Sequence, residues 1–198
     1  MSVATRPYHH GSLRPALLAA AEKALDRGGV QALSLRELAR EIGVSHAAPR
    51  RHFADKQALL DALAQEGFER LGREMTSAIE AAGPGLEAQL KALARTYVRF
   101  ATERAPLLDL MYAGKHRPGA EALREAADRA FEPPLALVEE AHAAGEISGD
   151  DVFRTGVVTW AAFHGIAAMA NNGMLGDAPL EPLVDQAVEQ LLDGLRPR

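Results

Sequence analysis

The stretch of sequence that decides the fold runs from Leu33 to Lys56 and reads LSLRELAREIGVSHAAPRRHFADK. Its first half predicts a helix of about two turns. Ser34 and Glu37 have the Ser-x-x-Glu spacing of a capping box, and apolar side chains then recur at helical spacing through Ile42. Gly43 is expected to end this helix, because glycine accepts the left-handed backbone that commonly follows a helix.

The second half of the stretch contains Pro49, which raises the question of whether it is a helix or a loop. Ser45 is a good N-cap residue, and Pro49 would then be the fourth residue of a helix. The first four N–H groups of a helix have no partner within it, so a proline this early removes at most one hydrogen bond. It also biases Ala48 away from helical backbone angles. We therefore expect a short, irregular helix, with a loop as the alternative.

Two short capped helices joined by a tight turn with glycine are typical of a helix-turn-helix. In this motif the second helix enters the major groove of DNA with its N-terminal residues first. Ser45, His46, Ala47 and Ala48 are small enough to bring the backbone close to the bases, and several donors for phosphates follow. These donors are Arg50, Arg51, His52 and Lys56. An ordinary helical hairpin without DNA is the alternative.

The remainder of the chain also reads as helix, so the predicted fold is all-α with about nine helices. Ser12 can cap the first helix, and Asp55 can cap a long helix over about 56–82. No segment shows the sustained alternation of a strand. Further helices are expected at about 86–104, 106–112, 119–144 with a kink at Pro133 and Pro134, 150–172 and 180–195.

Charge is unevenly distributed along the chain, although the formal net charge is only −5. Residues 1–60 contain nine Lys and Arg against five Asp and Glu, whereas the remainder contains thirteen against twenty-two. This asymmetry indicates a basic module for a polyanion and an acidic body. Arg6, before the first helix, could enter a minor groove, or its segment could be a disordered tail.

The composition excludes several other classes of protein. The chain has no cysteine, which excludes disulfides, thiolate metal sites and thiol nucleophiles. The N-terminal residues lack a secretory signal, and the most apolar stretch, from Trp160 to Leu175, is interrupted by His164, Asn171 and Asn172. We expect a cytoplasmic protein that does not interact with membranes, with no metal or cofactor and no enzymatic activity.

Over about Tyr8 to Leu71 the sequence resembles the DNA-binding domain of TetR-type (tetracycline-repressor-like) regulators. The matching features are a Leu-Ser/Thr-x-Arg-x-Leu-Ala run at residues 33–39, Gly-Val at 43–44, His-Phe at 52–53, and Lys56. The resemblance implies that Arg36 and residues 45–48 face bases and that Lys56 contacts a phosphate. The family usually has a phosphate-binding tyrosine where this chain has Arg50, which keeps a donor and adds charge.

The C-terminal half resembles those TetR-type regulators whose effector domain carries a Trp-x-x-x-His-Gly signature, present here as Trp160, His164 and Gly165. Aromatic and sulfur side chains on the middle helices suit a small apolar or aromatic effector. The alternative is that they only fill the core. The candidate ligand-binding residues are Phe100, Met111, Tyr112, Trp160, Phe163 and His164, with Tyr97 and Met169 in the same set.

The domain organisation predicted from these features is a helix-turn-helix DNA-binding domain over residues 8–55 and a helical effector-binding and dimerisation domain over 56–198. The helices at about 150–172 and 180–195 carry more apolar residues than one small body needs, which suits a two-fold, four-helix dimer interface. These residues are Val152, Val157, Val158, Ala161, Ala168, Leu183, Val188, Leu191 and Leu192. Gly156 and Gly165 indicate close approach of a neighbouring helix.

The function that follows is a ligand-responsive transcriptional regulator, a repressor, acting as a homodimer on a pseudo-palindromic double-stranded operator. The alternative is a helical small-molecule-binding protein or enzyme whose N-terminal hairpin is incidental. Sequence-specific retention on DNA at moderate salt discriminates between the two.

Overall fold

A computed structural model of the chain describes residues 13–148 and 151–196. Within these ranges it contains eight α-helices, two 3-10 turns and no strand. The predicted all-α class is confirmed, with one α-helix fewer than expected. The predicted cap at Ser12 and the arm around Arg6 lie outside the described residues. No helix in the described ranges is long and apolar enough to cross a membrane.

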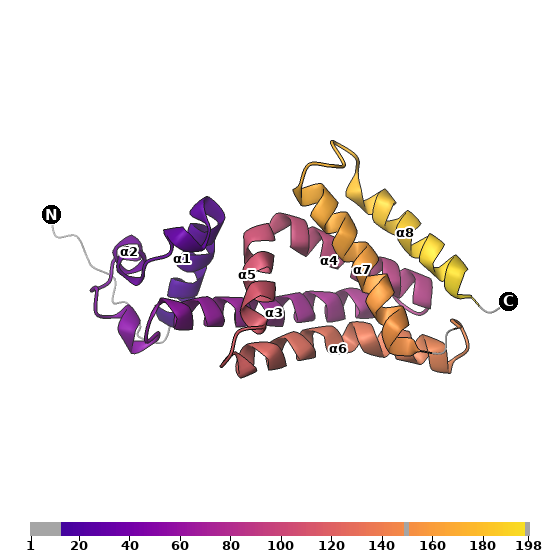
Figure 1. The fold of residues 1–198 in the computed structure, drawn as a ribbon, viewed down its shortest axis with the longest axis horizontal. Coiled ribbons are helices and arrows are strands. Elements are labelled where there is room, and N and C mark those ends of the chain that lie inside the picture. The colour runs from indigo at the N-terminus through magenta and orange to yellow at the C-terminus, as the bar shows by residue number, and fades with distance from the viewer. Residues whose placement is uncertain (1–12, 149–150, 197–198) are drawn as a thin grey trace.

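Three short elements and the first helix form a tip at one end of the molecule (Figure 1, indigo). They are α1 (Leu13–Gly28), the 3-10 turn η2 (Val30–Ala32), α2 (Leu35–Glu41) and the 3-10 turn η3 (Pro49–Arg51). Buried apolar side chains of the tip, including Leu17, Leu38 and Phe53, hold these elements together. This tip, residues 13–55, is therefore a packed unit built on the beginning of the next helix.

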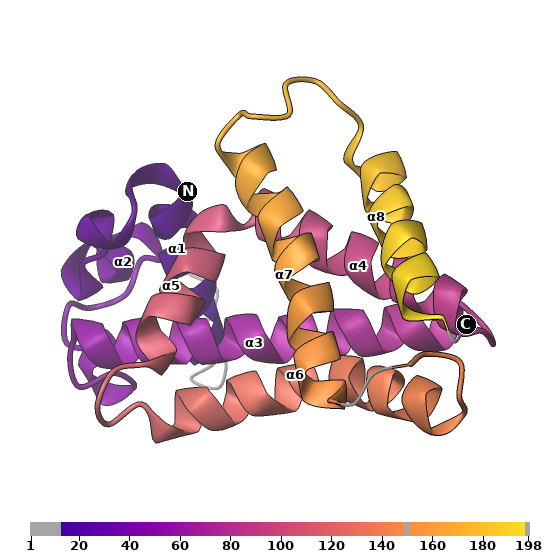
Figure 2. The ribbon, with the colours of Figure 1, turned by 45° about the vertical axis from the view of Figure 1, so that its right-hand side comes forward.

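The long helix α3 (Lys56–Ala81) runs from the tip into the body of the molecule (Figures 1 and 2). The carboxylate of Asp55 accepts a hydrogen bond from the backbone N–H of Ala58 over 2.8 Å, which confirms the predicted N-cap. Because α3 belongs to both parts, it connects the tip mechanically to the helices that pack farther along it.

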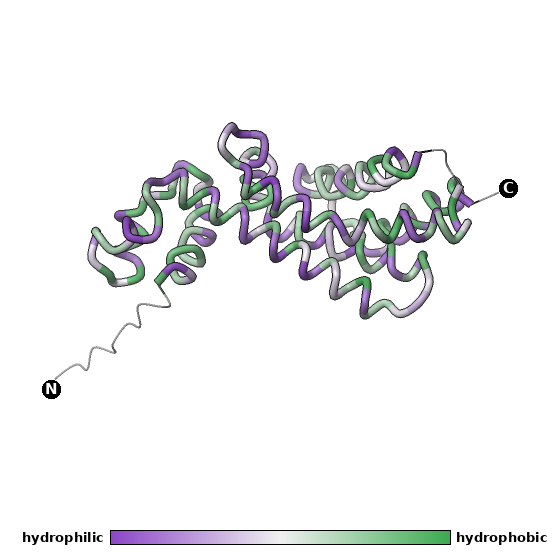
Figure 3. Tube along the Cα trace, turned by 90° about the horizontal axis from the view of Figure 1, so that it is seen from below, coloured by the Kyte–Doolittle hydropathy of each residue, from purple (hydrophilic) through white to green (hydrophobic). Residues whose placement is uncertain are grey.

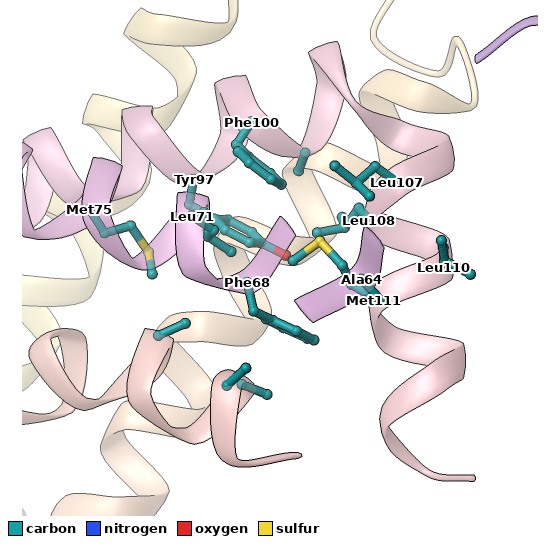
Figure 4. Packing of buried hydrophobic residues seen from close by; sticks show 14 of the residues in the cluster. Ala64, Phe68, Leu71, Met75, Tyr97, Phe100, Leu107, Leu108, Leu110 and Met111 are labelled. Carbon is teal, nitrogen blue, oxygen red and sulfur yellow. The ribbon is translucent and has the colours of Figure 1, made fainter. Parts of the chain in front are cut away.

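The body consists of α4 (Leu86–Glu103), α5 (Ala105–Lys115), α6 (Glu121–Ala143), α7 (Val152–Asn171) and α8 (Leu180–Leu195). In Figures 1 and 2, α6 lies along α3, while α7 crosses in front of α3 and α4 beside α8. Figure 3 shows hydrophobic and hydrophilic residues alternating along the helices, as amphipathic packing requires. The core between α3, α4 and α5 contains Phe68, Leu71, Tyr97, Phe100 and Met111 (Figure 4).

The contact between α3 and α6 is close because glycine stands on one side of it. A Cβ atom placed on Gly72 would lie 3.0 Å from the Cα of Ala130. α6 is one continuous helix through Pro133 and Pro134, where a kink was expected. The two helices therefore pack along much of their length, and the side chain of Pro134 is buried within α6.

The segment after α2 differs from the predicted helix, and Pro49 supplies the reason. In an α-helix capped by Ser45, the carbonyl of Ser45 would accept the N–H of residue 49, which proline lacks. It accepts the N–H of Ala48 instead, over 3.0 Å, and a single 3-10 turn over Pro49–Arg51 follows. Ala48 itself has helical angles, φ −62° and ψ −44°, contrary to the expected bias. The chain thus passes through two successive tight turns.

The capping box predicted for α2 is also absent in this structure. Ser34 occupies the N-cap position with extended backbone angles, but its side chain makes no capping hydrogen bond. Its carbonyl accepts the N–H of Leu38 over 2.9 Å, which is the first hydrogen bond of the helix. The start of α2 therefore has the residues of a capping box but not its side-chain hydrogen bond. The position at which α2 begins was nevertheless predicted within one residue.

Candidate nucleic-acid interface and ligand cavity

Gly43 supports the tight turn that follows α2. It has a φ of 75°, a region that favours glycine, and the N–H of Val44 reaches back to the carbonyl of Ala39 over 2.9 Å. Ile42 and Val44 pack partly buried against the core that contains Leu38. The turn therefore fixes the direction in which the following residues leave the tip.

The residues predicted to meet bases lie together on the surface of the tip. Ser45, His46 and Ala47 are exposed, and Ala48 is half-buried beside the buried Pro49. None of the exposed side chains is large, so the backbone between α2 and η3 is accessible from outside. A base edge could approach this segment without moving a bulky side chain.

Basic side chains surround this segment without acidic partners. Arg36 on α2 is exposed, and so are Arg50, Arg51 and His52, whereas Lys56 at the start of α3 is half-buried. Within the described part of the chain, neither these three arginines nor Lys56 forms an ion pair. These cations are thus available to an external anion.

Two other arginines of the tip, Arg27 and Arg40, are already paired with carboxylates. Arg27 contacts the carboxylate of Glu41 over 3.2 Å, and Arg40 lies 3.8 Å from Glu37. The paired arginines therefore have their charge partly neutralised by the tip itself. One part of this surface thus carries unpaired cations that are available to phosphates, whereas at Arg27 and Arg40 carboxylates of the tip already offset the positive charge.

A cavity of about 550 Å³ lies in the body between α4, α5, α6 and α7. This volume is in the range of small-molecule sites, and most of its lining is hydrocarbon or aromatic. Its lining residues are Leu90, Leu93, Tyr112, Lys115, Phe131, Pro134, Leu135, Val138, Phe153, Gly156, Val157, Thr159, Trp160, Ala161, Phe163 and His164. Phe153 and Val157 are largely exposed, so the cavity opens to the surface beside α7.

Trp160 forms the centre of one wall and is held by two aromatic neighbours. Its ring packs on Tyr97 at a centroid distance of 4.1 Å and meets Phe131 edge-on at 4.7 Å. Four residues further along α7, Nδ1 of His164 lies 2.7 Å from the hydroxyl of Tyr97. Burial raises the pKa of Tyr97 well above its ordinary value, so this hydroxyl stays protonated. Thus α4 and α7 are joined by one tilted aromatic contact and one hydrogen bond.

The six candidate ligand residues separate into two groups in the structure. Tyr112, Trp160, Phe163 and His164 line the cavity. Phe100 and Met111 do not line it, because both are fully buried in the core beside α3. Of the two further candidates, Tyr97 lies behind Trp160 in the core, and Met169 is exposed on α7.

The sequence reasoning missed Lys115 and Phe131 in the cavity wall. Lys115 follows Tyr112 by three residues and therefore shares its face of α5, a spacing that could have revealed it. Phe131 stands two residues before the proline pair of α6, a helix for which no inward-facing side chains were predicted. Both residues follow from helical spacing once the neighbouring helix is known.

The exposed surface of α7 is unusually apolar for a helix of a single chain. Val158 is 61% exposed, and Ala161 and Ala168 are also exposed on the same helix face. Gly165 belongs to this stripe, and among the described residues no atom of another element would lie within 4 Å of a Cβ placed there. The described part of the chain therefore does not supply the close neighbour expected at Gly165.

Two residues assigned to the dimer face from the sequence belong elsewhere. Val188 and Leu192 of α8 are 0% and 4% exposed, because they pack inside the chain. α8 is held to α4 by Arg95, whose guanidinium bonds the carboxylate of Asp185, and by Lys91, which contacts Glu189 over 2.6 Å. Leu183 and Leu191 are half-buried.

Two families of known proteins match the sequence of this chain. The family described as "Bacterial regulatory proteins, tetR family" matches residues 17–63, and the "Tetracyclin repressor-like, C-terminal domain" matches residues 90–195. Among curated proteins, no sequence is significantly similar to the chain.

Several solved structures share the whole fold. A protein of unknown function from Rhodococcus sp. RHA1 has 49% sequence identity and a TM-score of 0.91, covering 98% of this chain and 100% of its own. The TetR-family transcriptional regulator PfmR of Thermus thermophilus has 21% identity and a TM-score of 0.71, covering 91% and 99%. A TetR-family transcription regulator of Marinobacter aquaeolei has 20% identity and a TM-score of 0.74, covering 95% and 97%.

The two family matches cover the tip with its helix-turn-helix and most of the body. Regulators of this family bind DNA and dimerise, and the family is non-enzymatic. The chain belongs to the TetR family and is a DNA-binding transcriptional regulator.

Proposed function

We propose that the chain is a repressor whose affinity for a pseudo-palindromic operator is controlled by a small molecule in the cavity between α4, α5, α6 and α7. The observation that carries this proposal is the course of α3. It begins at Lys56, on the candidate DNA surface, and packs along α5 and α6, two of the helices that enclose the cavity. A ligand that moves these helices acts on the helix that holds the tip.

In this proposal, residues 8–55 form the DNA-binding domain and residues 56–198 form the effector-binding and dimerisation domain. Arg36 and residues 45–48 contact bases, and the basic group contacts phosphates. This group comprises Arg50, Arg51, His52 and Lys56. The absence of ion pairs at its arginines and lysine in the described chain supports this assignment.

The dimer forms through the apolar stripe of α7 together with the exposed edge of α8. An uncovered stripe containing Val158, Ala161, Gly165 and Ala168 supports this arrangement, since a second copy would bury it and the glycine would let two helix backbones approach. The two tips would then contact half-sites about 34–36 Å apart, or a multiple of that distance.

A ligand can shift the regulator only by its difference in affinity between the DNA-competent and incompetent states. With a coupling of about 1–3 kcal/mol, it would change operator affinity roughly 5- to 150-fold. The experiment first selects an operator from random DNA, then screens for compounds that raise the melting temperature. Each is titrated into the operator complex. Stabilisation of the protein without any change in operator affinity would contradict ligand control.

A further inference from the structure

The cavity has a polar end and an apolar end. Three lining side chains carry titratable groups, namely Tyr112, Lys115 and His164, and the last two both contact the ring of Tyr112. The nitrogen of Lys115 lies 4.8 Å from the centre of the Tyr112 ring, and the ring of His164 meets the same ring edge-on at 5.6 Å. Their shared contact with one aromatic ring places these groups together beside α5.

The opposite end of the cavity has hydrocarbon walls. Leu135 and Val138 of α6 face Phe153 and Val157 of α7 there. Phe153 and His164 are eleven residues apart on α7, which corresponds to about 16 Å along the helix axis. The space is therefore long, with its titratable groups at one end.

Lys115 is a half-buried cation without a counterion. Within the described residues it forms no ion pair, although the charge of Asp128 favours its protonated form from a distance. Burial lowers its pKa below the ordinary value, which reports the cost of keeping this charge against an apolar wall. An anion placed beside it would offset that cost.

The hydroxyl of Tyr112 lies at the same end of the cavity. It is buried and has no hydrogen-bond partner among the described atoms. Burial raises the pKa of Tyr112, while polar interactions with the side chains of Tyr97 and Trp160, whose geometry falls short of a hydrogen bond, oppose this rise. The hydroxyl of Tyr97 already bonds His164. The hydroxyl of Tyr112 therefore lies within the cavity wall, and the cation of Lys115 is the charged group offered to a ligand at this end.

Building on the proposed role of this cavity as the effector site, we propose that its ligand is an elongated apolar molecule with one terminal carboxylate. Lys115 pairs with the carboxylate, and the apolar tail lies along Phe153, Leu135 and Val157. The site would thereby select anionic over neutral or cationic molecules with the same tail.

The test uses three probes with one tail: decanoate, decanol and decylamine. Trp160 is the single tryptophan of the chain and lines the cavity, so its fluorescence reports binding directly. Decanoate should bind the wild-type protein about tenfold more tightly than decanol, and decylamine should bind most weakly, because a charged hydrogen bond contributes more than a neutral one.

Two substitutions and a control make the result specific. Lys115→Met should remove the preference for decanoate while leaving decanol binding unchanged, and Lys115→Arg should retain the preference. Lys23→Met makes the same chemical change at an exposed site on α1 and should leave all three affinities unaltered.

Equal affinities for decanoate and decanol in the wild-type protein would overturn the proposed carboxylate selectivity, and so would a preference that survives Lys115→Met. Either result would concern only the carboxylate selectivity and would remain compatible with a cavity that binds apolar effectors. Failure of all three probes to change Trp160 fluorescence or the melting temperature would overturn this inference. The proposed ligand control would still be tested separately by the compound screen against the operator complex.

Discussion

Arg70 of α3 donates two hydrogen bonds to the carboxylate of Glu22 on α1, over 2.8 and 2.9 Å and across 48 residues of sequence. The side chains are 25% and 19% exposed, and Arg104, between α4 and α5, lies 4.0 Å from the same carboxylate. Glu22 therefore connects the tip both to the long helix and to the body.

We expect Glu22→Gln to lower the free energy of unfolding by about 1–3 kcal/mol, because it leaves a half-buried guanidinium without its counterion. Urea denaturation measures this loss. Glu41→Gln is the matched control, since the pair of Glu41 with Arg27 is exposed and should contribute less than about 1 kcal/mol. Equal losses in the two variants would show that Glu22 is no more important than a surface charge.

Because of Tyr97, we expect the free energy of unfolding to decrease as the pH rises above about 10. Its pKa is raised in the folded state by burial, whereas in the unfolded chain a tyrosine ionises near pH 10. The stabilisation is complete below about pH 10 and is lost as the pH rises above it, because unfolding then releases a proton. Urea midpoints at about pH 8 and pH 10.5 should fall less steeply for Tyr97→Phe than for wild type. Identical pH dependence in both proteins would rule out this role for Tyr97.

The dimer interface is best tested on α7, since the exposed Ala168 does not belong to the packed interior. Ala168→Glu should give a folded monomer at micromolar concentration and weak operator binding, because it places a charge in the proposed interface. Ala122→Glu introduces the same side chain at an exposed site on α6 and should remain dimeric. Sedimentation equilibrium separates the outcomes, and a wild-type protein that is already monomeric would contradict the proposed assembly.

Helix boundaries could be predicted from the sequence where a local signal sets them. Asp55 caps α3 as expected because a cap depends only on the neighbouring backbone. The two turns around Pro49 were less predictable. Proline at the fourth helical position is compatible with both a helix and a turn, and the choice of hydrogen bond at Ser45 decides between them.

The cavity wall and the buried face of α8 could not be predicted from helical spacing alone. Phe100 and Trp160 are both aromatic residues on amphipathic helices, yet one is in the core and the other lines the cavity. Likewise, Val188 and Val158 are both apolar, but only the second is exposed. Spacing identifies the apolar face of a helix, and only tertiary packing decides what that face contacts.

The central claim is that the surface formed by the unpaired cations of the tip and by Lys56 binds DNA. Lys56 matters most because it stands at the first residue of α3, where the helix N-terminus also favours a phosphate. The most direct measurement is operator affinity as a function of salt concentration for wild type, Lys56→Ala and Arg27→Ala. The last variant removes a cation that is already paired with Glu41.

Lys56→Ala should bind all DNA sequences more weakly, and its plot of log affinity against log salt should be shallower by about one unit for each phosphate that is no longer neutralised. Arg27→Ala should match the wild type in both respects. Unchanged affinity and slope for Lys56→Ala on the selected operator would contradict the assignment of this surface to DNA.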